Sequence, residues 1–184
     1  MNSYQITAWC HHFISDHVKE GDLCIDATMG KGNDTELLCR LVKDSGHVHA
    51  FDIQQAALSY TKKRLEDSNL LSRCSLHLAS HTQMNQYCKP QSVSCIVFNF
   101  GYLPCFDHTI ATCPKTSVAA VKTGLTLLRK NGLMSLCIYS GGDTGFAERD
   151  ALLSLLKSLD PKAYLVIVSE YYNRPNHPPI PAFI

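Results

Sequence analysis

The residues best suited to chemistry lie in one short segment that contains two glycines. Asp26 opens this segment, Gly30 and Gly32 lie inside it, and Asp34 ends it. Glycines in a strand-to-helix turn let the backbone approach a ligand closely, and the N–H groups that begin the next helix are free to bind it. A dinucleotide fingerprint has a third glycine where this chain has Thr35. An acid at Asp26 would repel a pyrophosphate, but it suits a cation such as the amino group or sulfonium of S-adenosylmethionine.

Further polar residues follow the next two predicted strands. Asp52 and Gln54 come about 20 residues after Gly32, where a carboxylate accepts hydrogen bonds from ribose hydroxyls. This feature is common to dinucleotide and S-adenosylmethionine sites, so it does not separate them. Ser80 and His81 follow the third strand, in a loop that lies beside the adenine in sheets of this kind.

A candidate catalytic pair closes the fourth predicted strand. Asn99 lies at the strand end and Tyr102 follows three residues later, which resembles the Asn-Pro-Pro-Tyr motif of amino-group methyltransferases with Phe100-Gly101 in place of the prolines. An amine attacks a methyl carbon with its lone pair, and the Asn side-chain oxygen can accept the N–H bonds and so direct that lone pair. An aromatic ring can stack on a splayed-out base. The displacement requires no metal.

Two later segments can reach the same rim. Three glycines within 141–145 predict a tightly turned loop after the fifth strand. The proline-rich segment 173–181 carries Arg174 and His177, and an Arg there can contact a phosphate of a nucleic acid. We therefore expect both residues to bind the substrate.

Apolar periodicity predicts strands that alternate with helices. The predicted strands are 23–27, 47–52, 74–79, 93–100, 133–139, 163–170 and 180–184; the predicted helices are 6–18, 35–42, 54–67, 116–129 and 147–159. Asn131-Gly132 is typical of a helix C-terminus and is expected to end the helix 116–129. Regular alternation predicts a Rossmann-like α/β fold: a mostly parallel seven-stranded sheet with helices on both faces.

Composition is that of an ordinary globular protein. The chain has 184 residues, 45% of them apolar and 18% charged, which predicts a single domain over 1–184. No apolar run is long enough for a membrane span and the N-terminus lacks a signal-peptide pattern, so we expect a cytoplasmic protein without membrane contact. The nine cysteines form no C-x-x-C pair, which indicates no metal site and favours small buried apolar side chains. A net charge of +1 favours neither RNA nor a small substrate, and the oligomeric state stays open.

Taken together, these motifs resemble the YtqB-like family of class I S-adenosylmethionine-dependent methyltransferases, often labelled rRNA methylases. The resemblance covers nearly the whole chain and depends on residues 26–35, 46–54, 80–81, 99–104 and 176–178. It implies S-adenosylmethionine as cofactor, in a site lined by Lys31, Asp34, Asp52, Gln54, Ser80 and His81. Family members often have Asn in place of Lys31, and a cation near the sulfonium is unfavourable unless it points at the methionine carboxylate.

The same resemblance implies a substrate in the anticodon region of tRNA. Members of the MnmM type methylate the 5-aminomethyl group of (2-thio)uridine at wobble position 34 to the 5-methylaminomethyl form. That substrate atom is a primary amine, which agrees with the roles expected of Asn99 and Tyr102. The amine must lose a proton before it attacks, and His81 is the candidate base.

Other functions remain open from the residues alone. A methyltransferase of the same fold can act on rRNA or on a small amine, because fold does not fix the substrate. A nicotinamide-dependent oxidoreductase is disfavoured by Asp26 and by the missing third glycine. A non-catalytic module that binds an adenosine cofactor or RNA would tolerate the loss of Asn99.

Overall fold

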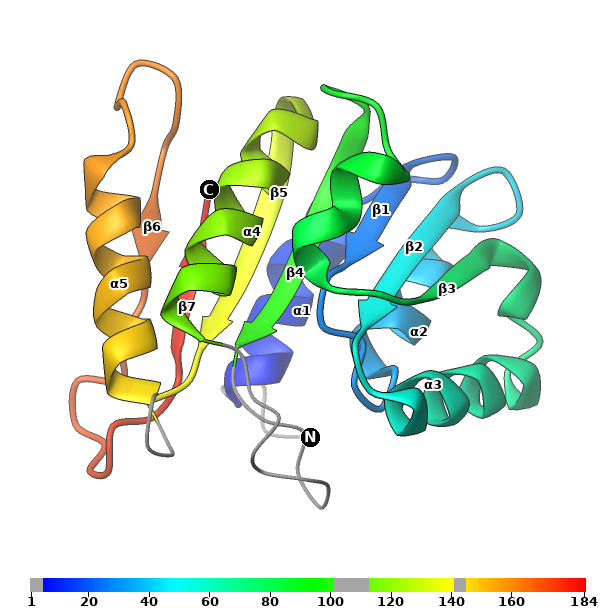
Figure 1. Cartoon of the computed structure of the whole chain (residues 1–184), viewed down its shortest axis with the longest axis horizontal. Coiled ribbons are helices and arrows are strands. Elements are labelled where there is room, and N and C mark those ends of the chain that lie inside the picture. Colours follow the sequence, from blue (N-terminus) through cyan, green and yellow to red (C-terminus); the bar gives the residue numbers. More distant parts are fainter. Residues whose placement is uncertain (1–4, 101–112, 141–144) are drawn as a thin grey trace.

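The computed structural model describes residues 5–100, 113–140 and 145–184. Its strands form one sheet in the order β3-β2-β1-β4-β5-β7-β6 (Figure 1). The strands are β1 Leu23–Asp26, β2 His47–Asp52, β3 Cys74–Leu78, β4 Val93–Phe100, β5 Leu128–Ile138, β6 Ile167–Val168 and β7 Ile180–Phe183. Strands β1 to β5 run parallel to one another, and β7 runs antiparallel to β5 and β6. The predicted mostly parallel seven-stranded sheet is therefore confirmed.

Helices cover both faces of the sheet. One face carries α1 Ile6–His17, α2 Asn33–Val42 and α3 Gln55–Asp67, and the other carries α4 Pro114–Leu127, α5 Gly145–Ser158 and the short 3₁₀ helix η2 His81–Gln86; a second 3₁₀ turn, η1 Leu71–Arg73, precedes β3. Apolar side chains that recur on one stripe of each helix bury that stripe against the sheet. In the described part of the chain, no helix is both long and apolar enough to cross a bilayer.

Two apolar clusters sandwich the sheet. Ile14, Leu38 and Leu65 from α1, α2 and α3 pack on the first face, and buried Cys24 and Cys95 lie among them as small apolar side chains. The opposite face is filled by large side chains that include Met84, Phe98, Phe100, Val121, Leu152 and Leu156. Strand β4 contributes to both clusters, which explains the uninterrupted apolar run 95–98 within it.

The N-terminal helix is part of this packing. Phe13 of α1 stacks on Phe183 of β7 with ring centroids 4.3 Å apart, and Cys10 is buried against Cys137 of β5. These contacts hold α1 across the central strands. Its His11 consequently lies next to the beginning of α2.

The predicted end of the helix before β5 is wrong. The helix ends at Leu127 and the chain becomes strand at once, so Asn131-Gly132 lies inside β5 rather than at a helix end. The reason is a long-range contact: the N–H groups of Gln91 and Ser92 donate to the carbonyls of Thr126 and Leu127, at 3.1 and 3.0 Å. A helix whose last carbonyls are bound in this way needs no glycine cap.

The sixth strand is also shorter than predicted. Only Ile167–Val168 pairs, instead of 163–170. The preceding residues turn because the N–H groups of Ala163 and Tyr164 both donate to the Asp160 carbonyl. The strand lies at the sheet edge, where pairing on one side alone leaves a short ladder.

Candidate active site

The predicted site residues meet at the carboxyl edge of the parallel strands. The N–H of Asn99, near the end of β4, donates to the Thr28 hydroxyl at 2.7 Å. The N–H of Gly30 donates to the Asp52 carboxylate, at the end of β2, at 3.1 Å. The ends of β4 and β2 are thereby tied to the same loop, which leaves β1 between them.

Asp26 is inside the glycine loop rather than at its surface. It is 0% exposed, and its two carboxylate oxygens accept hydrogen bonds from the Thr28 N–H at 3.1 Å and the Thr35 hydroxyl at 2.6 Å. Burial, and then the charge of Asp34, raise the pKa of Asp26 to about 7. Its contacts therefore fix the shape of the turn.

The two glycines of the loop adopt backbone conformations that favour glycine. Gly30 and Gly32 have φ values of 50° and 76°. A Cβ on Gly32 would lie 2.9 Å from the Thr61 side chain of α3, and the Thr61 hydroxyl donates to the Gly30 carbonyl at 3.2 Å. Gly32 is the N-cap of α2 and supplies no side-chain cap. The first-turn N–H groups of α2 are consequently available to an anionic ligand group.

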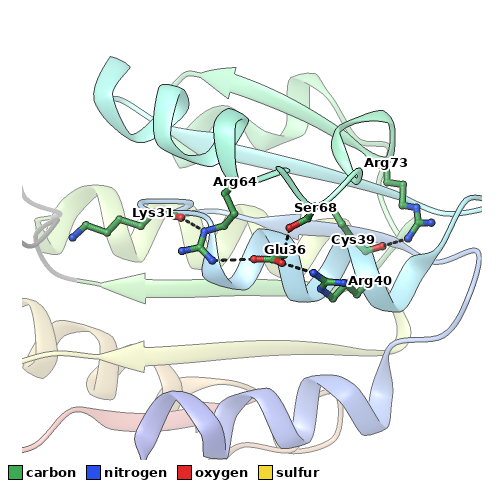
Figure 2. Close-up of polar contacts among 7 residues, drawn as sticks. All are labelled: Lys31, Glu36, Cys39, Arg40, Arg64, Ser68 and Arg73. Atoms are coloured by element: carbon green, nitrogen blue, oxygen red, sulfur yellow. Dashed lines mark hydrogen bonds and ion pairs between the residues drawn. The ribbon is translucent and has the colours of Figure 1, made fainter. Parts of the chain in front are cut away.

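A charged network ties the same loop to α3 (Figure 2). Arg64 donates to the Lys31 carbonyl at 2.8 Å and to Glu36 at 2.9 Å, and Glu36 also accepts from Arg40 and Ser68. Burial opposes ionisation of Glu36, but these three donors outweigh it and lower the pKa of Glu36 to about 2. The Lys31 side chain extends away from Arg64, and the described residues offer its ammonium no partner. The network thus holds the Lys31 backbone and does not engage its ammonium.

Asp52 and Ser80 both bind backbone groups at the ends of their strands. Asp52 accepts the N–H of Gln54 at 2.9 Å in addition to that of Gly30. Burial outweighs these bonds and raises the pKa of Asp52. Ser80 accepts the Thr82 N–H at 3.3 Å and so caps η2.

His81 is enclosed by aromatic rings. Its ring lies 6.2 Å from Phe98 and 6.5 Å from Phe100, both edge-on, and its Nε2 is buried without a hydrogen-bond partner in the described part of the chain. Burial, opposed by a hydrogen bond to the Ala27 backbone, lowers the pKa of His81 to about 4. An imidazole with that pKa is a weak proton acceptor at neutral pH, which argues against the role of base considered for it.

Asn99 is held by Asp34, and Asp34 by His11, a residue that the sequence analysis did not single out. Its side-chain amide donates to one carboxylate oxygen of Asp34, whose other oxygen lies 2.5 Å from Nε2 of His11. The hydrogen bond to Asp34 outweighs burial and raises the pKa of His11. His11 comes from α1, and neither motif nor spacing in the sequence signals its place here. The Asp34 carboxylate, expected to line the cofactor site, thus faces Asn99 and His11.

The remaining predicted residues differ in what the structure says of them. Tyr102 and the loop 141–144 lie outside the described residues. Arg174 and His177 precede β7, whose Ile180 pairs with Ile138 at the end of β5, so they lie at the same carboxyl edge. Arg174 is exposed, and the His177 ring packs edge-on against Phe146 of α5 at 5.3 Å.

Residues 48–184 match a protein family described as "Putative rRNA methylase". The chain belongs to this rRNA methylase family. A protein of the same description from Clostridium thermocellum has a crystal structure that is 40% identical, with a TM-score of 0.96 and coverage of 100% of this chain and 98% of that one. A "putative methyltransferase" from Streptococcus mutans, solved in complex with SAH, is 34% identical, with a TM-score of 0.88 and coverage of 97% and 96%.

A further relative carries a more specific name. The Arabidopsis thaliana "tRNA (mnm(5)s(2)U34)-methyltransferase, chloroplastic" is 31% identical over 170 residues, which are 88% of this chain and 62% of the relative. The protein is an S-adenosylmethionine-dependent methyltransferase of the class I, Rossmann-like fold, and S-adenosylmethionine is its cofactor. The expected cofactor and fold are confirmed, and the oxidoreductase alternative is excluded.

Proposed function

We propose that this member of the rRNA methylase family is an N-methyltransferase that acts on tRNA. Its substrate is the 5-aminomethyl group of (2-thio)uridine at wobble position 34, and its product is the 5-methylaminomethyl form. The observation that carries the proposal is Asn99, an amide at the end of the central strand β4 that is joined to the glycine loop through Thr28 and held by Asp34. The name of the Arabidopsis relative supports the same substrate.

The residues around the glycine loop fit S-adenosylmethionine, which supplies a methyl group on a positively charged sulfur. The open N–H groups of α2 suit the methionine carboxylate, and Lys31 adds a positive charge at the same end. Gly30 and Gly32 allow the close backbone approach, while Asp26 maintains the turn. Asp52 with Gln54 is assigned to the ribose hydroxyls, and Ser80 with His81 to the border of the adenine.

Asn99 supplies what an amine nucleophile needs. Its amide nitrogen donates to Asp34, and its side-chain oxygen, which has no partner among the described residues, can accept an N–H from the substrate. This contact points the lone pair of the neutral amine at the methyl carbon. The N–C bond forms as the S–C bond breaks, the sulfur leaves as a neutral thioether, and the resulting secondary ammonium then releases one proton to solvent. An aliphatic ammonium titrates near pH ~10 in water, so we expect the rate to rise with pH through the pKa of the bound amine.

The substrate side extends along the carboxyl edge. Tyr102, three residues beyond Asn99, is assigned the stacking contact with the uridine base. Arg174 and His177, at the same edge beyond β5, are assigned contacts with anticodon phosphates. The partner is therefore the anticodon region of tRNA. Because the net charge of the chain is only +1, the protein would bind this region through local contacts.

The deciding experiment is a methyl-transfer assay on tRNA isolated from cells that lack the enzyme, read by nucleoside mass spectrometry. We expect 5-aminomethyl uridine to be converted to the 5-methylaminomethyl form in a reaction that requires S-adenosylmethionine. Purified rRNA and small amines are tested in parallel, because the family description names rRNA. Transfer to rRNA or to a small amine, with no conversion in tRNA, would overturn the proposal and leave the cofactor and fold unchanged.

A further inference from the structure

The contact between Asn99 and Asp34 has a fixed polarity. An ionised carboxylate has only acceptors, so the Asn99 amide must present its nitrogen to Asp34 and its oxygen to the opposite side. A free asparagine amide can turn over, and its two ends would then exchange places. Asp34 therefore determines which atom of Asn99 meets the substrate.

Asp34 is itself held from the other side. His11 Nε2 lies 2.5 Å from the second carboxylate oxygen of Asp34, and both side chains are largely covered, at 31% and 13% exposure. His11 is anchored by its helix, because Phe13 stacks on Phe183 and Cys10 packs against Cys137. The imidazole thus adds a donor, and when protonated a charge, that holds the Asp34 carboxylate in place.

We propose that His11 and Asp34 are positioning residues for methyl transfer: Asp34, fixed by His11, holds Asn99 with its side-chain oxygen turned toward the substrate amine. This inference rests on the proposed function, since it gives Asn99 an amine to orient. It also assigns the N-terminal helix a part in the active site. Neither His11 nor Asp34 takes the amine proton in this arrangement.

Asp34→Asn is the first test. An amide at position 34 can donate as well as accept, so it permits the Asn99 amide to turn over. We expect kcat on tRNA to fall by about 10²-fold, the scale of a misplaced reacting group. The dissociation constant of S-adenosylmethionine and the KM for tRNA should stay within about threefold, because ground-state binding is retained. A cofactor affinity that falls in parallel with kcat would overturn the proposal.

His11 is tested by removal and by rescue. His11→Ala loses one charge-assisted hydrogen bond to Asp34, and we expect kcat to fall about tenfold. His11→Gln keeps an N–H donor and should recover most of that loss. The matched control is His12→Gln, because His12 is 65% exposed on the same helix and, in the described chain, contacts Asp16, Trp9 and Phe13 rather than Asp34. If Gln is as inactive as Ala at position 11, His11 transfers a proton and the positioning role is wrong.

A measurement without substrate separates this inference from the proposed function. In NMR spectra of the free protein, Asp34→Asn should shift the Asn99 side-chain amide resonances and lower the pKa of His11, whereas His12→Gln should do neither. Unchanged Asn99 resonances in Asp34→Asn would overturn the positioning role. Wild-type enzyme that shows this coupling but methylates no tRNA would instead overturn the proposed substrate.

Discussion

The two halves of the carboxyl edge are held in different ways. On the side of β2 and α3, charged side chains bind backbone groups: Asp52 accepts a loop N–H and Arg64 donates to a loop carbonyl. On the side of β4, the side-chain amide of Asn99 is held by the side chain of Asp34 and through it by that of His11. Backbone contacts fix the shape of a loop, whereas a series of side chains fixes one functional group. The first half is built to bind and the second to orient.

This difference makes the two halves separable by mutation. Changes in the binding half should act on cofactor affinity and on the free energy of unfolding, because the loop shape depends on them. Changes in the orienting half should act on kcat, because they move a group that is needed only when the methyl is transferred. A variant in one half that changes the quantity expected of the other half would show that the two halves are coupled.

The largest effect is expected in the orienting half. Asn99→Ala removes the amide that directs the amine, and we expect kcat to fall by about 10²-fold or more, with cofactor affinity nearly unchanged. Single-turnover methyl transfer and calorimetric titration of S-adenosylmethionine measure the two quantities. Asn85→Ala, at an exposed position on η2, is the matched control. A kcat close to wild type in Asn99→Ala would show that this amide does not direct the amine.

The next effect belongs to the binding half. Gly32→Ala places a Cβ 2.9 Å from Thr61 in a backbone conformation with φ of 76°, and we expect it to lower the free energy of unfolding by about 1–3 kcal/mol. Gly21→Ala is the control, because Gly21 also has a positive φ, 85°, but its nearest neighbour is Ser45 at 3.6 Å. Urea unfolding compares them. Equal losses of unfolding free energy in the two variants would mean that the positive-φ backbone accounts for the whole effect and that the contact with Thr61 adds nothing.

The binding half was predictable because its signals are local in sequence. Glycines at 30 and 32 and a carboxylate at 52 report their own turn and strand end, since each feature follows directly from residue type and spacing. The orienting half joins residues that are far apart: Asp34 lies 65 residues from Asn99 and 23 from His11. No periodicity encodes such a pairing, so the sequence predicts Asn99 and Asp34 as site residues but neither the contact between them nor the part of His11.

The same distinction explains the errors in the fold. Asn131-Gly132 has the residue types that end helices, but contacts from Gln91 and Ser92 end α4 earlier. The alternation of strands and helices was predicted correctly because each element buries an apolar stripe that its own sequence carries. Boundaries set by a distant segment could not be read in this way.

Arg64 allows a sharper test of how the binding half works. Arg64 and Arg40 both pair with Glu36, but only Arg64 also donates to the Lys31 carbonyl (Figure 2). We expect Arg64→Ala to weaken S-adenosylmethionine binding about tenfold, the equivalent of one charged hydrogen bond, and Arg40→Ala to leave it unchanged. Calorimetric titration measures both. Equal losses in the two variants would assign the effect to Glu36 rather than to the loop carbonyl.

The smallest effect concerns the strand that carries Asp52. His49 of β2 lies against His77 of β3, with Nδ1 and Nε2 2.9 Å apart, and burial together with the neighbouring imidazoles lowers the pKa of His49 to about 4. The unfolded chain binds this proton near its ordinary value of 6.5, so the stabilisation is complete above that pH and is lost as the pH falls toward 4. Buried Asp26, with its pKa raised to about 7, acts in the opposite direction over the same range.

The informative quantity is therefore the difference in unfolding free energy between wild type and His49→Gln, in which the Asp26 contribution cancels. We expect wild type to lose about 1 kcal/mol relative to the variant between pH ~7 and pH ~4.5, a value discounted because the ring is only half-buried. Urea unfolding at a series of pH values gives this difference. If it stays constant, the imidazoles do not hold β2 against β3. If the difference changes with pH while wild type and His49→Gln have the same kcat, the contact between His49 and His77 supports the binding half alone. The division of the edge into a binding and an orienting half then extends into the sheet.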